Sequence, residues 1–186
     1  MSRSEFGHAR TTCDCNDCKL NCKYVPGYLI PSDLGRLVPP DADPFKWAES
    51  NLFASSGALV MDKSTGQQFR VPTLVPSTVG NSYRCHWLDV NDRCSVHADA
   101  PFGCAFFDCS MDGPEADKLS SSGIIEIIKC YKSTPPGLYA QLWIYLYENG
   151  YRAASPDVRR DAMRREYICQ LTGIPPHMIR KSSVDG

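Results

Sequence analysis

Apolar residues at helical spacing dominate the second half of the chain. Ile124, Ile127 and Ile128 fall on one face of a helix that the pattern predicts from about residue 123 to the proline pair at 135–136. A second helix is predicted from that pair to residue 150. Its apolar side consists of Leu138, Leu142, Tyr145 and Leu146.

Capping residues predict three further helices. Ser155 is the expected N-cap of a helix over 156–171, with proline at its first position. Ser32 is predicted to cap a short helix that continues to residue 37. Asp43 is predicted to cap a longer helix that ends at Gly57. The apolar side of this longer helix consists of Trp47, Leu52 and Phe53.

Two segments read as β-hairpins. Residues 58–61 and 68–71 flank a turn at 63–66, and residues 84–90 and 94–97 flank Asn91-Asp92. The predicted fold class is therefore α+β. A small cysteine-rich region of loops and hairpins holds metal and packs on C-terminal helices. We expect a single domain over 1–186, with a cysteine-rich metal-binding part at 13–112 and a helical part at 120–174.

Composition is that of an ordinary globular protein. The chain has 186 residues, 42% of them hydrophobic and 22% charged, and a net charge of -1. This charge balance argues against nucleic acid or an anionic membrane as a partner. The first eight residues contain no apolar signal-peptide core, and no apolar run reaches the length of a membrane span. We therefore expect a cytoplasmic protein.

Eight of the ten cysteines fall into two groups. The N-terminal group, spaced C-x-C-x2-C-x3-C, is Cys13, Cys15, Cys18 and Cys22. The central group, spaced C-x8-C-x9-C-x4-C, is Cys85, Cys94, Cys104 and Cys109. Thiols so close in sequence pair poorly as disulfides and bind metal readily, especially in a reducing compartment.

The eight thiols suffice for two four-coordinate sites, or for one site that takes ligands from both groups and leaves spare cysteines. Cys130 and Cys169 lie in predicted helices and are interpreted as packing residues. His86 adjoins Cys85, His97 lies three residues after Cys94, and either side chain could replace a thiolate as a metal ligand. We interpret both as hydrogen-bonded hairpin histidines.

The spacing favours an iron–sulfur cluster as the cofactor over zinc. Structural zinc sites usually contain two C-x2-C pairs, and this chain has one such pair, at Cys15 and Cys18. The N-terminal group comes within one residue of a bacterial ferredoxin spacing. Zinc is the alternative.

The helical part carries charge and aromatic side chains. Four arginines of the last helix are interpreted as a solvated face: Arg159, Arg160, Arg164 and Arg165. The aromatic residues around 139–151 are interpreted as core, with a homodimer or a partner protein as a second interpretation.

The ordered cysteine segments resemble the YkgJ-like cysteine-cluster family, also described as zinc- or iron-chelating CxxCxxCC proteins. The similar segments are C-N-D-C at 15–18 with Cys22, C-H-W-L at 85–88, C-S-V-H at 94–97, P-F-G-C at 101–104, and Cys109. Where the family has arginines beside the proline and after the cysteine of the segment at 101–104, this chain has Ala100 and Ala105. The resemblance implies metal chelation by about eight cysteines and leaves the reaction open.

Three functions follow from these observations. The first hypothesis is an iron–sulfur protein that transfers electrons or serves as an accessory to a partner enzyme. The second is a structural zinc-binding interaction module. The third is a metal-dependent enzyme that modifies a peptide, a protein side chain or a small molecule, which requires an open coordination position. The sequence identifies no catalytic residue.

Overall fold

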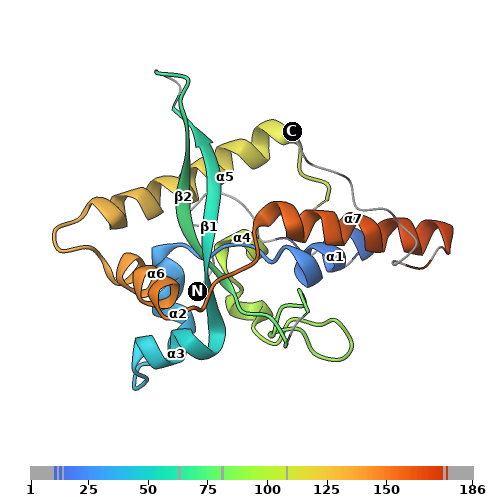
Figure 1. Cartoon of the computed structure of the whole chain (residues 1–186), viewed down its shortest axis with the longest axis horizontal. Helices are drawn as coiled ribbons and strands as arrows, with labels where there is room; N and C mark the ends of the chain where they lie inside the picture. Colours follow the sequence, from blue (N-terminus) through green and yellow to red (C-terminus); the bar gives the residue numbers. More distant parts are fainter. Residues whose placement is uncertain are drawn as a thin grey trace.

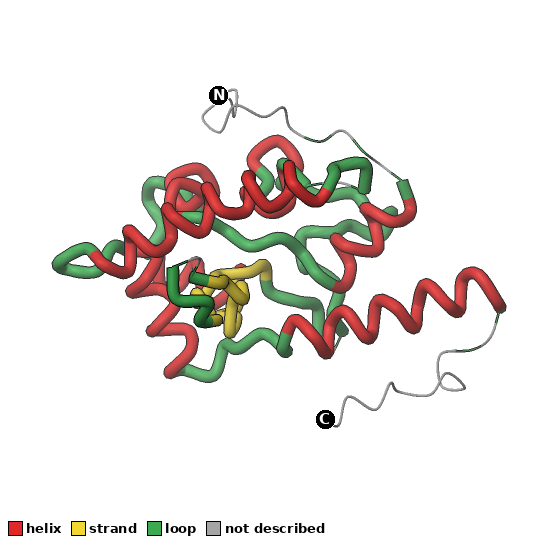
Figure 2. The backbone as a smooth tube through the Cα atoms, turned by 90° about the horizontal axis from the view of Figure 1, so that it is seen from above, coloured by secondary structure: helices red, strands yellow, loops and turns green. Residues whose placement is uncertain are grey.

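A two-stranded antiparallel hairpin runs through the centre of the molecule, with helices around it (Figures 1 and 2). The computed structural model describes residues 11, 13, 15–62, 64–80, 82–107, 109–173 and 175. This part of the chain contains seven α-helices and one sheet, which confirms the predicted α+β class. Residues 1–10, on which the prediction about a signal peptide rests, lie outside the described part.

The hairpin is formed by β1 (Leu52–Met61) and β2 (Gln68–Pro76), paired from Leu52 with Pro76 to Met61 with Gln68. The predicted hairpin is confirmed, and its strands are longer than the sequence indicated. The register shifts between Ser55 and Ala58. Gly57 lies at this irregularity with φ +86, and a Cβ atom there would lie 1.7 Å from the carbonyl oxygen of Val71.

Four helices cover the inner half of the hairpin and form the core with it. They are α2 (Pro31–Leu37), α3 (Pro44–Asn51), α5 (Gly113–Lys132) and α6 (Leu138–Glu148). Tyr139 of α6 is buried at their centre, where its hydroxyl donates to Leu29 O at 2.7 Å and accepts from Leu74 N at 2.8 Å. The aromatic core interpretation is thus confirmed for Tyr139, whereas the homodimer or partner interface stays a prediction.

The cysteine-rich part lies beside this core. It contains α1 (Asn16–Tyr24), the 3₁₀ helix η2 (His97–Asp99) and α4 (Phe102–Ala105). The last helix, α7 (Pro156–Thr172), lies along α1 (Figure 1). As predicted, Ser155 caps α7 by accepting from Val158 N at 3.3 Å. Gly173 ends the helix with φ +69.

A buried carboxylate joins the core to the cysteine-rich part. Asp33 is fully buried, and its Oδ2 accepts from Ile30 N and from Phe102 N, each at 2.8 Å. The first bond caps the start of α2, and the second fixes the start of α4. Arg36 supplies the counter-charge through an ion pair with Oδ1. The site-bearing helix α4 is therefore fixed in position by a core residue.

Several predicted boundaries were wrong. Asp43 caps α3 as expected, but α3 ends at Asn51, and Leu52 and Phe53 begin β1 instead of continuing the helix. Both residues adopt extended backbone and not helix because they pair with residues of β2. The cap of α2 is the position of Ile30, not Ser32.

α5 begins at Gly113, ten residues before the predicted start. Leu119 is the first buried residue of the helix, so its first turns show no apolar periodicity in the sequence. The helix begins there because Asp112 is its N-cap and accepts from Glu115 N at 2.7 Å. The predicted second hairpin is replaced by turns with isolated bridges, Thr78 with Cys85 and Leu88 with Cys94. Among the described residues, no helix has the length and apolarity needed to cross a membrane.

Candidate metal centre

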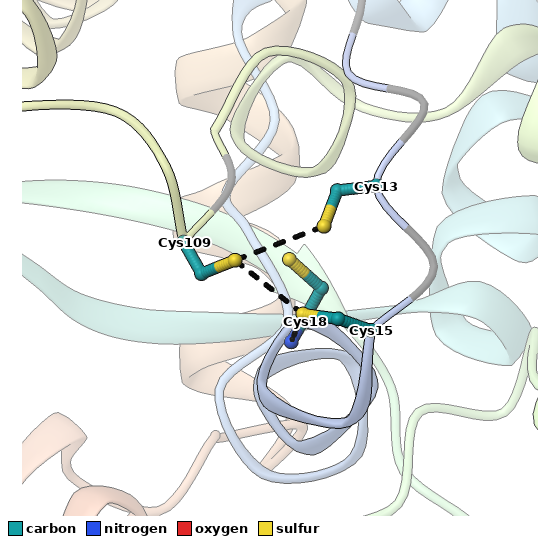
Figure 3. A group of neighbouring side chains, drawn as sticks. All are labelled: Cys13, Cys15, Cys18 and Cys109. Carbon is teal, nitrogen blue, oxygen red and sulfur yellow. Dashed lines mark hydrogen bonds between the residues drawn. The ribbon is translucent and has the colours of Figure 1, made fainter.

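Four cysteine sulfurs converge at the N-terminal end of α1 (Figure 3). The Sγ atoms of Cys13, Cys15, Cys18 and Cys109 all lie within 4.8 Å of one another. Cys109 Sγ is 3.4 Å from Cys15 Sγ and 3.7 Å from Cys13 Sγ. We call these four residues the first thiol set. Its chemistry is that of a metal site, because four thiolates directed at one point are the donor set of zinc and iron centres.

Local helix geometry places three of these thiols. Cys15 is the N-cap of α1, and its Sγ accepts from the backbone N–H of Cys18 at 3.5 Å. The C-x2-C pair therefore occupies the N-cap and N3 positions, where a capping side chain meets the first free N–H groups. The positive end of the helix dipole favours thiolate at this point. Cys13 precedes the helix, and its N–H donates to Thr11 Oγ1 at 3.1 Å.

The fourth thiol comes from 94 residues further along the chain. Cys109 lies in the turn between α4 and α5, and is exposed. The N-terminal segment reaches it because Thr11 N donates to Ala105 O, at the end of α4, at 2.8 Å. The first thiol set thus connects the start of α1 to the turn that follows α4.

Hydrogen bonds and burial shift the pKa values of Cys15, Cys18 and Cys109. The N–H of Cys18, aided by the Cys109 thiol, lowers the pKa of Cys15 to about 7. Hydrogen bonding to Cys15 and Cys13 raises the pKa of Cys109 to about 11, and burial raises the pKa of Cys18. One thiolate is therefore stabilised by protonated neighbours, as expected of a site whose remaining protons a metal ion would displace.

The other four cysteines of the two sequence groups gather next to this site. Cys22, Cys85, Cys94 and Cys104 all line one cavity of about 710 Å³, which also reaches the first thiol set. We call them the second thiol set. Cys22 lies on α1 and Cys104 on α4, and Cys85 and Cys94 each form one of the isolated bridges.

Every member of the second thiol set lies near the other three. Burial raises the pKa of Cys85 to about 12, and the Cys94 and Cys22 thiols add to that rise. Burial and the Cys94 thiol raise the pKa of Cys22. The pKa of Cys104 is well above its usual value because of burial and because all three other thiols are close. These causes connect all six pairs within the set.

The structure therefore sorts the eight thiols differently from the sequence. Cys109 leaves the central group for the first thiol set, and Cys22 leaves the N-terminal group for the second. Cys130 on α5 and Cys169 on α7 line neither site. None of the ten cysteines, all in the described part of the chain, forms a disulfide.

The two histidines differ in their surroundings. His86 is held in a hydrogen-bond network, with Nδ1 3.0 Å from Ser77 Oγ and Nε2 3.1 Å from Asn51 Oδ1, and burial lowers its pKa. Both ring nitrogens are thus engaged, which confirms the interpretation of His86 as hydrogen-bonded. His97 lies on η2 at the wall of the cavity, and its interpretation stays a prediction.

Arg159 corrects one prediction. It was interpreted as part of a solvated helix face, but its side chain is only 4% exposed, between α7 and the cysteine-rich part. Its Nε donates to Tyr24 O at 2.7 Å, at the end of α1. Its charge is close enough to Cys85 to lower the pKa of that thiol. The sequence pattern of four arginines on one helix does not indicate which of them is buried.

Arg160 and Arg165, on the same helix, form ion pairs at the surface, with Asp157 at 3.8 Å and Asp161 at 3.2 Å. Arg160 and Arg164 are exposed, in agreement with a solvated face, whereas Arg165 is half-buried.

No known family model, curated protein or solved structure matches the chain. The resemblance to the YkgJ-like family stays a prediction that rests on the cysteine segments.

Proposed function

We propose that the chain is a metal-binding protein whose first thiol set binds a single ion. The observation that carries this proposal is the convergence of the four Sγ atoms of the first thiol set within 4.8 Å. Four thiols this close repel one another when they ionise, and a divalent cation relieves that repulsion while each thiol loses its proton.

The distances between the sulfur atoms of the first thiol set support zinc as this ion. Tetrahedral zinc with Zn–S bonds of about 2.3 Å holds its sulfurs about 3.8 Å apart. Cys109 Sγ stands 3.4 Å from Cys15 Sγ and 3.7 Å from Cys13 Sγ, near that value. A cluster of several irons needs wider spacing, because its thiolates are distributed over different metal atoms. Mononuclear iron fits the same spacing, so elemental analysis distinguishes the two.

A four-thiolate site supports a structural role. All four positions of a tetrahedral ion are taken by protein ligands, which leaves none for a substrate or water. The ion would fix Cys13 and α1 to the turn at Cys109. The hypothesis of a metal-dependent enzyme has no support at this site, since it needs an open position.

The test is the metal content of the full-length protein and of two variants. We expect wild-type protein to hold about one zinc ion at the first thiol set. Cys109→Ser removes one ligand and is expected to lose this ion. Cys169→Ser is the matched control, because it changes a thiol on α7 outside both sets. Zinc retained at full occupancy in Cys109→Ser would contradict the proposal.

The second candidate function is the iron–sulfur protein predicted from the sequence, acting in electron transfer or as an accessory to a partner enzyme. The observation that favours it is the second thiol set, whose spacing and surroundings differ from those of the first.

A further inference from the structure

The second thiol set is wider than the first. Among the described residues, the first thiol set is the one group of three or more potential ligands whose donor atoms all lie within 4.8 Å. The sulfurs of Cys22, Cys85, Cys94 and Cys104 line the same cavity without meeting that limit. Around one tetrahedral ion they would need to stand about 3.8 Å apart.

The cavity that these thiols line, together with members of the first thiol set, has room for more than one ion. The cavity measures about 710 Å³, whereas one water molecule takes roughly 30 Å³ in the liquid. Its walls include Trp87, Leu88 and Phe107, which pack with the core. Cys85 is only 5% exposed. Cys22, Cys94 and Cys104 are half-buried, so the second thiol set is less exposed than the first, which has an exposed ligand in Cys109.

We propose that Cys22, Cys85, Cys94 and Cys104 are the ligands of a second metal centre, an iron–sulfur cluster, and that Arg159 is its buried counter-charge. Four thiolates are the usual ligand set of clusters with two or four irons, and such clusters need more room between their ligands than zinc. The two centres then differ in kind: a single ion at the first thiol set and a cluster at the second.

The surroundings of Arg159 support its part in the proposal. The Nη2 group of this arginine is buried and has no hydrogen-bond partner in the described part of the chain. A buried cation is costly unless a negative charge compensates it. A thiolate-ligated cluster carries net negative charge. Arg159 lies beside the second thiol set, because its Nε donates at 2.7 Å to Tyr24 O, two residues after Cys22 on α1. The arginine and the cluster would therefore compensate each other.

Close backbone contact supports the position of Cys104. The N–H of Gly27 donates to Cys104 Sγ at 3.2 Å. This contact needs glycine on both sides, because a Cβ atom at Gly27 would lie 1.9 Å from the carbonyl carbon of Gly103. N–H donors to ligand sulfurs are a main means by which proteins set cluster potentials. The N–H of Gly27 can therefore reach Cys104 Sγ only because residues 27 and 103 are both glycine.

The first experiment measures iron, acid-labile sulfide and zinc in full-length protein purified without oxygen and reconstituted with ferrous iron and sulfide. We expect iron and sulfide in equal amounts, with visible absorption from thiolate-to-iron charge transfer. Cys104→Ser is expected to lose iron and sulfide but to keep the ion of the first thiol set. Cys109→Ser is expected to do the reverse, so failure of either site is recognised separately.

X-ray absorption at the iron edge of wild-type protein gives a readout that needs no variant to fold. Iron–iron scattering supports the cluster. Two results would overturn the proposed cluster. One is zinc at both thiol sets without sulfide after reconstitution, and the other is iron without an iron neighbour.

The second experiment measures the reduction potential of the cluster in Arg159→Met and Arg159→Lys. Reduction adds negative charge, which a buried cation stabilises, so loss of the charge in Arg159→Met is expected to lower the potential. Arg159→Lys keeps the charge and is expected to stay closer to wild type. Equal potentials in the two variants would remove Arg159 from the proposal, because a merely structural arginine would affect stability but not potential.

Discussion

Cys18 and Cys22 lie one turn apart on α1, yet their thiols belong to different sets: Cys18 meets Cys13, Cys15 and Cys109, and Cys22 meets Cys85, Cys94 and Cys104. Four residues of helix advance about 6 Å along the axis. One short helix is therefore the common wall of two neighbouring sites, and its geometry sets the distance between them.

This relationship predicts that breaking α1 disrupts both sites together. Asn21→Pro places proline inside the helix between the two ligands, which costs about 3 kcal/mol and displaces Cys22 relative to Cys18. We expect the purified variant to lose metal from both thiol sets, as measured by elemental analysis. Asn21→Ala is the control, because alanine preserves the helix. Full metal content in Asn21→Pro would show that the sites do not depend on α1.

The first thiol set is expected to hold α1 in place more than apolar packing does. Leu20 is the one buried residue of the nine in α1. In Cys109→Ser, hydrogen exchange is expected to become faster over 16–19 and 105–111, because the ion no longer joins these segments. Exchange in α6, which packs on β1, is expected to stay unchanged. Equal protection of α1 in wild type and variant would contradict the structural role.

Cys130 and Cys169 are expected to be dispensable for metal. Both lie on helices away from the two thiol sets, Cys130 on α5 and Cys169 on α7. Cys130→Ser and Cys169→Ser should therefore retain wild-type iron, sulfide and zinc. Loss of metal in either variant would show that the assignment of ligands to the two sets is wrong.

The buried carboxylate of Asp33 is expected to be essential for stability. Asp33→Ala leaves Ile30 N and Phe102 N without this acceptor and removes the counter-charge of Arg36. Removing one partner of a buried ion pair typically costs about 3–5 kcal/mol, which urea denaturation measures. Asp41→Ala, in an exposed turn, is the control and should change stability by no more than about 0.5 kcal/mol. A similar small change in Asp33→Ala would contradict the prediction.

Tyr139 is expected to link stability to alkaline pH. Burial raises its pKa well above the ordinary value, so the folded chain keeps a proton that the unfolded chain releases above about pH 10. The stability from this group is fully present below that pH and declines as pH rises beyond it. Denaturation by urea at pH 8 and above pH 10 should therefore show a smaller pH-dependent loss in Tyr139→Phe than in wild type.

At pH 8 the same variant is expected to be less stable than wild type by about 2 kcal/mol or more, because Leu29 O and Leu74 N lose their buried partner. An unchanged pH dependence would mean that Tyr139 ionises as readily in the folded chain as in the unfolded one.

Much of the fold could be predicted from local signals. Asp43 and Ser155 were identified as caps because an oxygen side chain before proline satisfies the first free N–H groups of a helix. The start of α5 could not be found from apolar spacing, since Leu119 is nearly alone in being buried in its first turns. The turns around Cys85 and Cys94 resemble strands in sequence, but only isolated bridges form there.

The sequence by itself determined that this chain concentrates thiols suited to metal, because eight of its ten cysteines fall into two groups whose close spacing disfavours disulfides and suits metal ligation. Only the tertiary structure decided which thiols meet. Cys109 joins Cys15 because α4 holds the following turn against the N-terminal segment. Cys22 lies about 6 Å further along the axis of α1 than Cys18, which separates it from the partners of Cys18. Arg159 turns inward for the same kind of reason: the packing of α7 on α1, which no local pattern encodes, sets which side of the helix is buried.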